Sequence, residues 1–174
     1  MTRILARVIA VAALAITATL VASVPAQAAA VRQIKTVKDG TCVRPYANPA
    51  DLRAQNCNSK PTRARDWQVI RVGTLNTHPL WQLKNANTGK CLARSGTTGL
   101  GVPYSQSCGL GASTYWEVFT IKSGSKTTAI VLKSFSAFAW AGRHACLRYE
   151  GKYRAANVEL ATCDVRQTLQ RWRP

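Results

Sequence analysis

The feature that most constrains this chain is a pattern of cysteine and tryptophan residues that occurs three times. The segments Ile34–Val43 and Leu83–Leu92 align without a gap. Each begins with an aliphatic residue and lysine, and each ends with glycine, any residue, cysteine and an aliphatic residue. A third copy, Leu132–Leu147, shares the aliphatic-lysine start and the cysteine-aliphatic end, with six additional residues between its lysine and its cysteine. Such repetition predicts three similar units that bury one common core.

Each copy continues with a second cysteine and then a tryptophan. The second cysteine follows the first after 15, 17 and 17 residues, and Trp67, Trp116 and Trp172 follow 10, 8 and 9 residues later. The sequences after Trp67 and Trp116 are near copies of one another, whereas the third copy ends two residues after its tryptophan. We expect the three tryptophans to pack in the core rather than to contact a ligand.

Short strands and turns account for the local pattern within each unit. The segments that begin at Trp67 and Trp116 alternate with a period of two, as half-buried strands do. The turn-forming segments Lys38–Gly40 and Asn87–Gly89 stand just before a first cysteine. After residue 30, no stretch has the apolar stripe and caps of a helix. The 174 residues suit one domain. We therefore expect an all-β domain over residues 31–174, with repeats at about 31–72, 80–121 and 130–174.

The first 28 residues read as a signal peptide. Arg3 and Arg7 precede the apolar run Val8–Val24, and the segment Ala26–Ala28 has the small-x-small pattern of a cleavage site. The apolar run is shorter than the roughly 20 residues that span a bilayer. The sequence therefore predicts a secreted, extracellular protein without a membrane span.

In an oxidising extracellular compartment, an even number of cysteines favours disulfide bonds, so the six cysteines are expected to be paired. Six cysteines allow 15 pairings, and the equivalence of the repeats selects one bond within each of them. The predicted bonds are Cys42–Cys57, Cys91–Cys108 and Cys146–Cys163. No Cys-x-x-Cys pair is present, and His78 and His144 lack ligand spacing. Neither a metal site nor a cofactor is expected.

Three units with this order of residues resemble the ricin B-type lectin family, including the trefoil subunits of cytolethal distending toxins. The family marker, Gln-x-Trp at the end of each unit, is complete in Gln170–Trp172, while the other two units keep only the tryptophan. The resemblance covers about residues 31–172. It implies a β-trefoil of three pseudo-symmetric repeats, each with one intra-repeat disulfide, and a lectin-like role in carbohydrate binding.

The residues at the family's sugar-binding positions depart from its usual pattern. Galactose-binding members place an aspartate two residues after the first cysteine and an aromatic residue two before the second. Here the first position holds Arg44, Ala93 and Arg148, and the second holds Gln55, Gln106 and Ala161. An arginine offers only donors, so it suits a carboxylate or sulfate rather than a sugar hydroxyl that needs an acceptor. We therefore expect acidic glycans rather than neutral galactosides.

The third repeat offers the best candidate ligand pocket. It combines aromatic rings, a carboxylate, amides and a cation, which are the usual components of a polar ligand site. The candidate residues are Arg148, Tyr149, Glu150, Tyr153, Asn157 and Gln170. The alternative interpretation is a solvated hairpin with half-buried tyrosines and a structural Gln170.

A second candidate surface lies in the insertion of the third copy. Phe135, Phe138 and Trp140 stand there without a charged neighbour, which favours an exposed contact patch. A longer strand buried against the barrel is the alternative. An exposed patch supports a second function that the resemblance implies, a cell-targeting subunit that binds a toxic partner protein.

Other function classes fit less well. The chain carries 24 Lys and Arg against 7 Asp and Glu, a net charge of +17, which attracts polyanions without specificity. The cations are scattered, and no motif for nucleic-acid recognition is present. Nothing brings His78 and His144 together, and no nucleophile elbow or zinc-protease motif occurs. The sequence thus predicts a non-catalytic binding module for glycans or anionic cell-surface polymers.

Overall fold

The computed structural model describes residues 30–173 except 47–50, 76, 110 and 152–155. Within this range the strands join into one sheet. The strands are β1 (Ala30–Gln33), β2 (Lys35–Thr36), β3 (Cys42–Pro45), β4 (Leu52–Gln55), β5 (Asp66–Leu75), β6 (His78–Asn85), β7 (Lys90–Arg94), β8 (Pro103–Ser107), β9 (Trp116–Ser123), β10 (Lys126–Ser134), β11 (Ala145–Tyr149), β12 (Ala156–Thr162) and β13 (Trp172–Arg173). The helical elements are η1 (Thr62–Arg65), η2 (Ala112–Thr114), α1 (Phe135–Ala141) and η3 (Thr168–Gln170).

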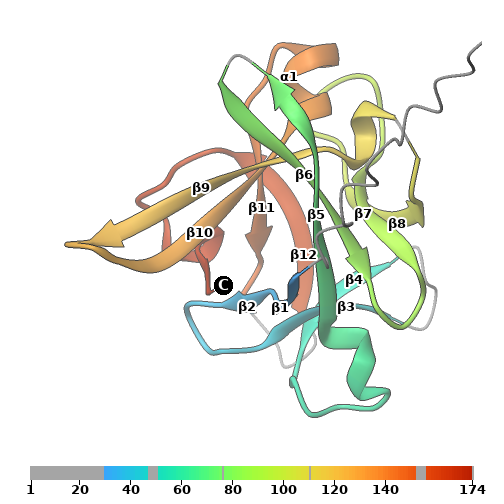
Figure 1. Ribbon diagram of the computed structural model, residues 1–174, viewed down its shortest axis with the longest axis vertical. Coiled ribbons are helices and arrows are strands. Elements are labelled where there is room, and N and C mark those ends of the chain that lie inside the picture. The colour runs from blue at the N-terminus through green and yellow to red at the C-terminus, as the bar shows by residue number, and fades with distance from the viewer. Residues whose placement is uncertain (1–29, 47–50, 76, 110, 152–155, 174) are drawn as a thin grey trace, which may run out of the picture.

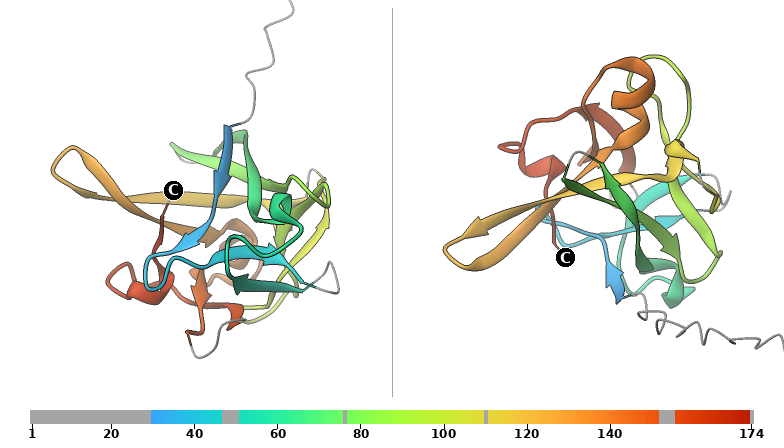
Figure 2. Two further views of the ribbon diagram at one scale, coloured as in Figure 1. Left: turned by 90° about the horizontal axis from the view of Figure 1, so that it is seen from below. Right: turned by 45° about the horizontal axis from the view of Figure 1, so that its top comes forward.

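The long strands close into a barrel. Antiparallel pairs join β5 to β6, β6 to β9, β9 to β10 and β10 to β13. The ring closes through β1 and β2, which flank Ile34, because β1 pairs with β5 and β2 pairs with β13. Figures 1 and 2 show this arrangement, with the β9–β10 hairpin extending away from the rest of the barrel.

Each repeat adds one hairpin to the barrel. The hairpins are β3–β4, β7–β8 and β11–β12, and a one-turn helix (η1, η2 or η3) leads from each to the following tryptophan. Three copies of hairpin, turn and barrel strand make the β-trefoil that the sequence predicts. The three expected disulfides are also confirmed: each joins the first strand of one hairpin to a cysteine one or two residues beyond its second strand, with Cα–Cα distances of 5.0, 5.0 and 4.9 Å.

The three repeat tryptophans anchor the core, as predicted. Trp67, Trp116 and Trp172 are fully buried. Each indole N–H donates to the carbonyl oxygen of the residue after the first cysteine of its own repeat. The N–O distances are 2.9 Å to Val43, 2.9 Å to Leu92 and 3.2 Å to Leu147. In each repeat, an equivalent buried hydrogen bond therefore links a barrel strand to the hairpin.

The insertion in the third repeat was expected as an exposed loop or a longer strand, but it folds as the helix α1. Its sequence, FSAFAWA, contains no β-branched residue, and alanine favours helix. Gly142 ends the helix in the left-handed conformation (φ 59°), which glycine adopts without a Cβ clash. Ser136 and Ala137 are buried, and α1 packs against η2. A seven-residue helix held by such packing lacks the long apolar stripe that sequence periodicity detects.

Some sequence predictions fall outside the described residues. These are the signal peptide at residues 1–28 and the candidate ligand residue Tyr153. Within the described part of the chain, no helix is long and apolar enough to cross a membrane.

Candidate binding site

A cavity of about 530 Å³ lies where the three hairpins meet. Its wall comes from one strand of each repeat: β4, β8 and β12. The residues that line it stand four, five and six positions before the second cysteine in every repeat. They are Asp51, Leu52 and Arg53; Val102, Pro103 and Tyr104; and Asn157, Val158 and Glu159, together with Glu150. Equivalent residues meet because the strands surround the pseudo-threefold axis, and we call this space the axial cavity.

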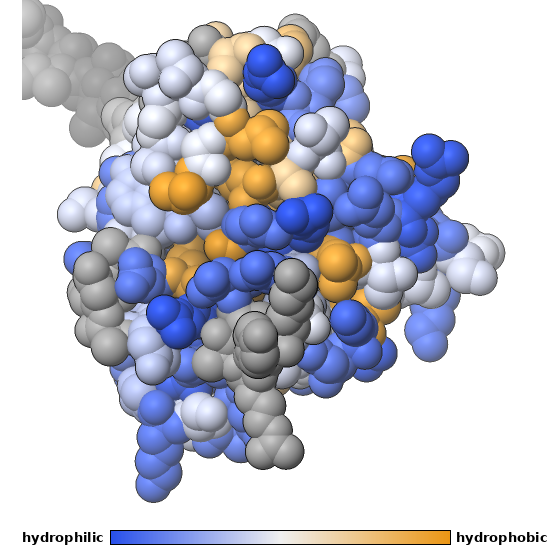
Figure 3. All heavy atoms as spheres, turned by 180° about the vertical axis from the view of Figure 1, so that it is seen from behind, coloured by the Kyte–Doolittle hydropathy of each residue, from blue (hydrophilic) through white to orange (hydrophobic). Residues whose placement is uncertain are grey.

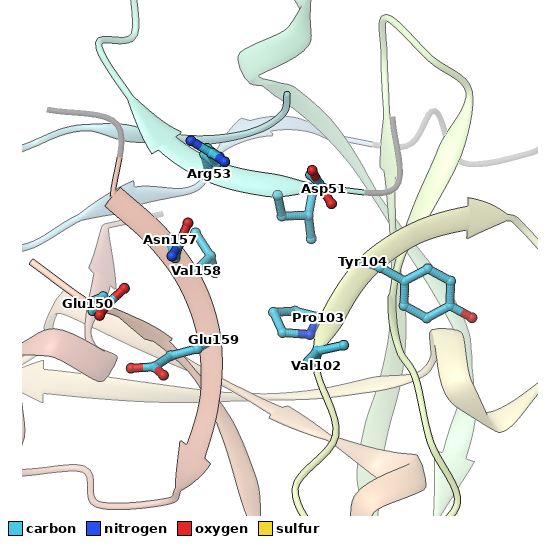
Figure 4. Close-up of a pocket in the computed structure, with 10 residues that line it drawn as sticks. Asp51, Arg53, Val102, Pro103, Tyr104, Glu150, Asn157, Val158 and Glu159 are labelled. Atoms are coloured by element: carbon cyan, nitrogen blue, oxygen red, sulfur yellow. The ribbon is translucent and has the colours of Figure 1, made fainter. Parts of the chain in front are cut away.

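The axial cavity has an apolar floor. Leu52, Pro103 and Val158 occupy equivalent positions and are buried. Figure 4 shows Pro103 and Val158 directed toward the middle of the triangle that the three strands form. Such a floor suits an apolar face of a ligand, and the volume lies in the roughly 300–1,000 Å³ range of ligand sites.

The rim of the axial cavity carries most of the polar groups. Asp51, Glu150 and Asn157 are exposed, and Glu159 is half-buried. Three of the chain's seven acidic residues thus lie around one cavity in a protein of net charge +17. Figure 4 places Glu150, Asn157 and Glu159 together on the third-repeat side. Carboxylate and amide oxygens accept hydrogen bonds, so this side offers acceptors to a ligand that donates.

Two other lining residues are engaged with their own repeats. The Arg53 guanidinium lies 4.2 Å from the ring centroid of Tyr46, a cation–π distance. The Tyr104 side chain points outward in Figure 4, and its hydroxyl donates to Gln106 at 2.5 Å. Gln106 in turn donates to Ser113 at 2.7 Å.

Arg94 holds the loop that supplies the second repeat's part of the cavity. Its side chain is buried, and its guanidinium donates to several carbonyl oxygens of residues 96–100, including Leu100 at 2.8 Å. Burial lowers the pKa of Arg94. Gly101 follows with φ +71°, and a Cβ there would lie 2.1 Å from the Ser95 carbonyl oxygen. This loop therefore requires both the arginine and the glycine to present Val102 to the cavity.

A hydrogen bond between repeats fixes the third hairpin. The Tyr149 hydroxyl donates to Asp39 at 2.6 Å, although the two residues belong to different repeats. Burial alone raises the pKa of Asp39, but hydrogen bonds from Thr36, Tyr149 and Thr41 outweigh it and lower the pKa to about 2. Burial, followed by the bond to Asp39, raises the pKa of Tyr149 to about 12. The adjacent Glu150 is thereby held at the rim.

The predicted ligand residues of the third repeat divide into two groups. Arg148, Glu150 and Asn157 lie on the β11–β12 hairpin, and Glu150 and Asn157 line the axial cavity. Tyr149 and Gln170, by contrast, are buried. The Gln170 amide donates to the Thr162 carbonyl oxygen at 2.7 Å, and its oxygen accepts from the Asp164 N–H at 2.8 Å. Both polar groups of the Gln170 side chain thus bond to the backbone, in agreement with the alternative interpretation of Gln170 as a structural residue.

Both arginines at the family's aspartate position are also engaged. Arg44 is buried, and it donates to the carbonyl oxygens of Ser59 at 2.6 Å and Pro61 at 3.0 Å. Arg148 forms an ion pair with Glu159 on the opposite strand. The two arginines on which the expectation of acidic glycans partly rested thus have partners within the protein.

The predicted contact patch is only partly exposed. Phe138 on α1 is 45% exposed and stacks on His144, with ring centroids 5.3 Å apart. Phe135 is half-buried, and its ring centroid lies 6.4 Å from that of Tyr115. The Trp140 side chain lies outside the described residues.

The two histidines do not form a catalytic pair with a carboxylate in this arrangement. His144 contacts Phe138, whereas His78 lies near Phe119, with ring centroids 6.2 Å apart. Lys133 lies between these phenylalanines, about 5.5 Å from each ring centroid, and binds Glu117 at 3.3 Å. Among the described residues, no group of histidine, cysteine or acidic side chains is placed to hold a metal ion.

A second cavity of about 270 Å³ opens at the barrel. Its lining is largely apolar and includes the equivalent residues Ile34, Leu83 and Leu132 together with the half-buried Trp81. In Figure 3, seen from behind, apolar side chains form a narrow tract with hydrophilic side chains on either side. The protein surface on that face is therefore mainly polar.

No family model and no curated protein sequence matches the chain. Solved structures do match its fold. The cytolethal distending toxin of Haemophilus ducreyi aligns with a TM-score of 0.64 and 18% identity over 82% of this chain and 80% of that chain. A designed threefold-symmetric protein, ThreeFoil, aligns with a TM-score of 0.64 and 14% identity over 82% and 96%.

A lectin is also similar. The Polyporus squamosus lectin, solved with the epitope Neu5Acα2-6Galβ1-4GlcNAc, aligns with a TM-score of 0.65 and 14% identity. The alignment covers 84% of this chain and 49% of the lectin. At these identities the likeness establishes the β-trefoil fold, and the function must be argued from the site.

The axial cavity was not predicted from the sequence. The signal was present, because alignment of the repeats on their second cysteines places Leu52, Pro103 and Val158 at one position. Only closure of the threefold ring brings three such positions into contact. The family pattern directed attention instead to the outer positions, which here are filled by internal hydrogen bonds and an ion pair.

Proposed function

We propose that this protein is a secreted, non-catalytic carbohydrate-binding module whose binding site is the axial cavity. The observation that carries the proposal is the combination of an apolar floor with a rim of acceptors. A pyranose ring presents an apolar face of C–H groups and an edge of hydroxyl donors. The floor residues Leu52, Pro103 and Val158 fit the face, and Asp51, Asn157 and Glu150 fit the hydroxyls.

The outer positions support the choice of the axial cavity. In the first repeat Arg44 is buried, in the second Gln106 bonds to Tyr104 and Ser113, and in the third Arg148 is paired. Polar groups that are already satisfied gain little from a ligand. The three disulfides support the secreted location, because such bonds persist in oxidising compartments.

The fold neighbours support the same class of function. The Polyporus squamosus lectin was solved with a sialylated trisaccharide, and the Haemophilus ducreyi protein is a toxin. Both neighbours share the β-trefoil fold with this protein, and the lectin among them fits the proposed binding role.

Titration of a saccharide panel into the ¹⁵N-labelled protein tests the proposal. We expect chemical-shift changes centred on Asp51, Val102 and Asn157, and we expect every saccharide to be recovered unchanged. The Asn157→Ala variant should lose at least about tenfold in affinity, because an acceptor and a donor leave the rim.

The matched control is Asn87→Ala. Asn87 is exposed in the turn between β6 and β7 and does not line the axial cavity, so its replacement should leave affinity unchanged. The proposal fails if no saccharide shifts the cavity resonances, or if Asn157→Ala binds as tightly as the parent.

A second function, a subunit that docks a partner protein, is favoured by one observation. The helix α1 has no counterpart in the other two repeats, and it exposes Phe138. This function predicts a stoichiometric complex when the protein is isolated from its native source, and it predicts that Phe138→Ser dissociates that complex. A native protein that elutes as a monomer in light-scattering chromatography would contradict it.

A further inference from the structure

We propose that Glu159 sets the charge selectivity of the axial cavity. By holding Arg148 in an ion pair, it leaves a site that accepts neutral and amine-bearing sugars and rejects sugar acids. This inference rests on the proposed function, since it names the class of sugar that the same cavity takes.

The geometry of the ion pair carries the first step. Arg148 on β11 lies opposite Glu159 on β12 in the hairpin register. Its Nε donates to Glu159 Oε1 at 2.8 Å, and its Nη2 donates to the same oxygen. The guanidinium thus directs two donors at one carboxylate oxygen, while Oε2 remains an acceptor for a ligand hydroxyl or ammonium group.

The exposure of the Arg148–Glu159 ion pair indicates how much it contributes to stability. The side chains of Arg148 and Glu159 are 34% and 36% exposed, and ion pairs at this exposure contribute little to stability. The pair therefore has a larger effect on the charge of the rim than on the fold. Glu159 belongs to the lining of the axial cavity, and Figure 4 shows its carboxylate on the side of β12 that faces Glu150, so its charge acts at the rim rather than over the apolar floor.

The charges that surround the pair define the sign of the site. Asp51 and Glu150 also line the axial cavity, and neither forms an ion pair in the described part of the chain. Arg53 is the cation of the lining, and it lies against Tyr46. Among the described lining residues, with Arg148 held by Glu159, the carboxylates of Asp51 and Glu150 outnumber the single guanidinium of Arg53, and a ligand carboxylate meets net repulsion.

The other repeats show why Glu159 alone has this effect. The positions equivalent to Glu159 hold Arg53 and Tyr104, which lie opposite Arg44 and Ala93. Arg44 is buried against carbonyl oxygens, and alanine carries no charge. Arg53 of the first hairpin is half-exposed too, but it lies against the Tyr46 ring. Among the described hairpin residues, Arg148 is therefore the half-exposed arginine that a carboxylate holds.

The test uses three sugars of one ring type that differ only in charge: the neutral hexose, its 2-amino derivative and its uronic acid, in the gluco, galacto and manno series. In the parent protein, at least one series should show the neutral and amino sugars binding at least about tenfold more tightly than the uronic acid. The preference should decrease in 0.5 M salt, where the screening length is only several ångströms.

Replacement of Glu159 should then reverse the selectivity. Glu159→Gln keeps the side-chain shape and frees the Arg148 guanidinium, so affinity for the uronic acid should rise about tenfold. The double variant Glu159→Gln/Arg148→Ala should lose that gain. Asp164→Asn is the matched control, because Asp164 pairs with Arg166 on the exposed surface outside the axial cavity. It removes the same charge and should leave selectivity unchanged.

The outcomes separate the two proposals. If none of the sugars binds, the proposed function fails. If sugars bind but the parent takes the uronic acid as tightly as the neutral hexose, the selectivity proposal fails and the carbohydrate site stands. It also fails if Glu159→Gln leaves the uronic acid affinity unchanged while its thermal unfolding matches that of the parent.

Discussion

Replacement of Trp116 by phenylalanine probes the interaction that the three repeats share. The Trp116 side chain is fully buried, and its indole N–H donates to the Leu92 carbonyl oxygen at 2.9 Å. Phenylalanine has no donor, so the Leu92 oxygen is left buried without its partner at a cost of about 1–3 kcal/mol. The phenyl ring also fills less space, which adds about 1–2 kcal/mol for the void. We expect a total loss of about 3 kcal/mol.

Chemical denaturation monitored by tryptophan fluorescence and calorimetry measures this loss. With the disulfides intact, about 3 kcal/mol corresponds to a decrease of about 6–12 °C in Tm for a domain of this size. Trp67→Phe should cost a similar amount, because its hydrogen bond to Val43 has the same length of 2.9 Å.

The control is the same substitution at Trp81, which is half-buried at the barrel opening and has no tryptophan counterpart in the other repeats. Trp81→Phe should cost less than about 1 kcal/mol. The reasoning is refuted if the Trp116 and Trp81 variants lose equal stability, or if Trp116→Phe unfolds like the parent.

Three further predictions concern the disulfides, pH and a loop. The double variant Cys91→Ser/Cys108→Ser opens a 17-residue crosslink and should lose about 3 kcal/mol in denaturant titrations; an unchanged midpoint would contradict this. Asp39, with a folded pKa of about 2 against an ordinary value of 3.8, contributes stability above about pH 4 that disappears as the pH falls toward 2. Because its side chain is exposed, we expect Asp39→Asn to cost only about 1 kcal/mol at pH 6 and progressively less as the pH falls through 2. Acid-series calorimetry measures this, and a cost independent of pH would count against the assignment. Gly101→Ala places a Cβ 2.1 Å from the Ser95 carbonyl oxygen and should lower Tm by several degrees, whereas an unchanged Tm would mean that the loop relaxes freely.

Particular residues show how far prediction from sequence reached. The tryptophans and the cysteines were assigned correctly because their roles follow from repetition, since equivalent positions in a symmetric fold make equivalent contacts. The helix α1 was not expected, because its position depends on packing against η2 rather than on its own periodicity. Two of the predicted ligand residues, Glu150 and Asn157, line the axial cavity, whereas Tyr149 and Gln170 are buried. That any of them binds a ligand stays a prediction.

The sequence by itself determined the three-unit trefoil, its disulfides and its core tryptophans, because these features are local or are repeated along the chain. Only the tertiary structure decided what the charged residues do. Whether an arginine is free, buried or paired depends on which atoms fold against it: Arg44 meets carbonyl oxygens, Arg94 a loop and Arg148 a carboxylate. Closure of the ring likewise placed three separate strands around one axis, and the axial cavity exists only there.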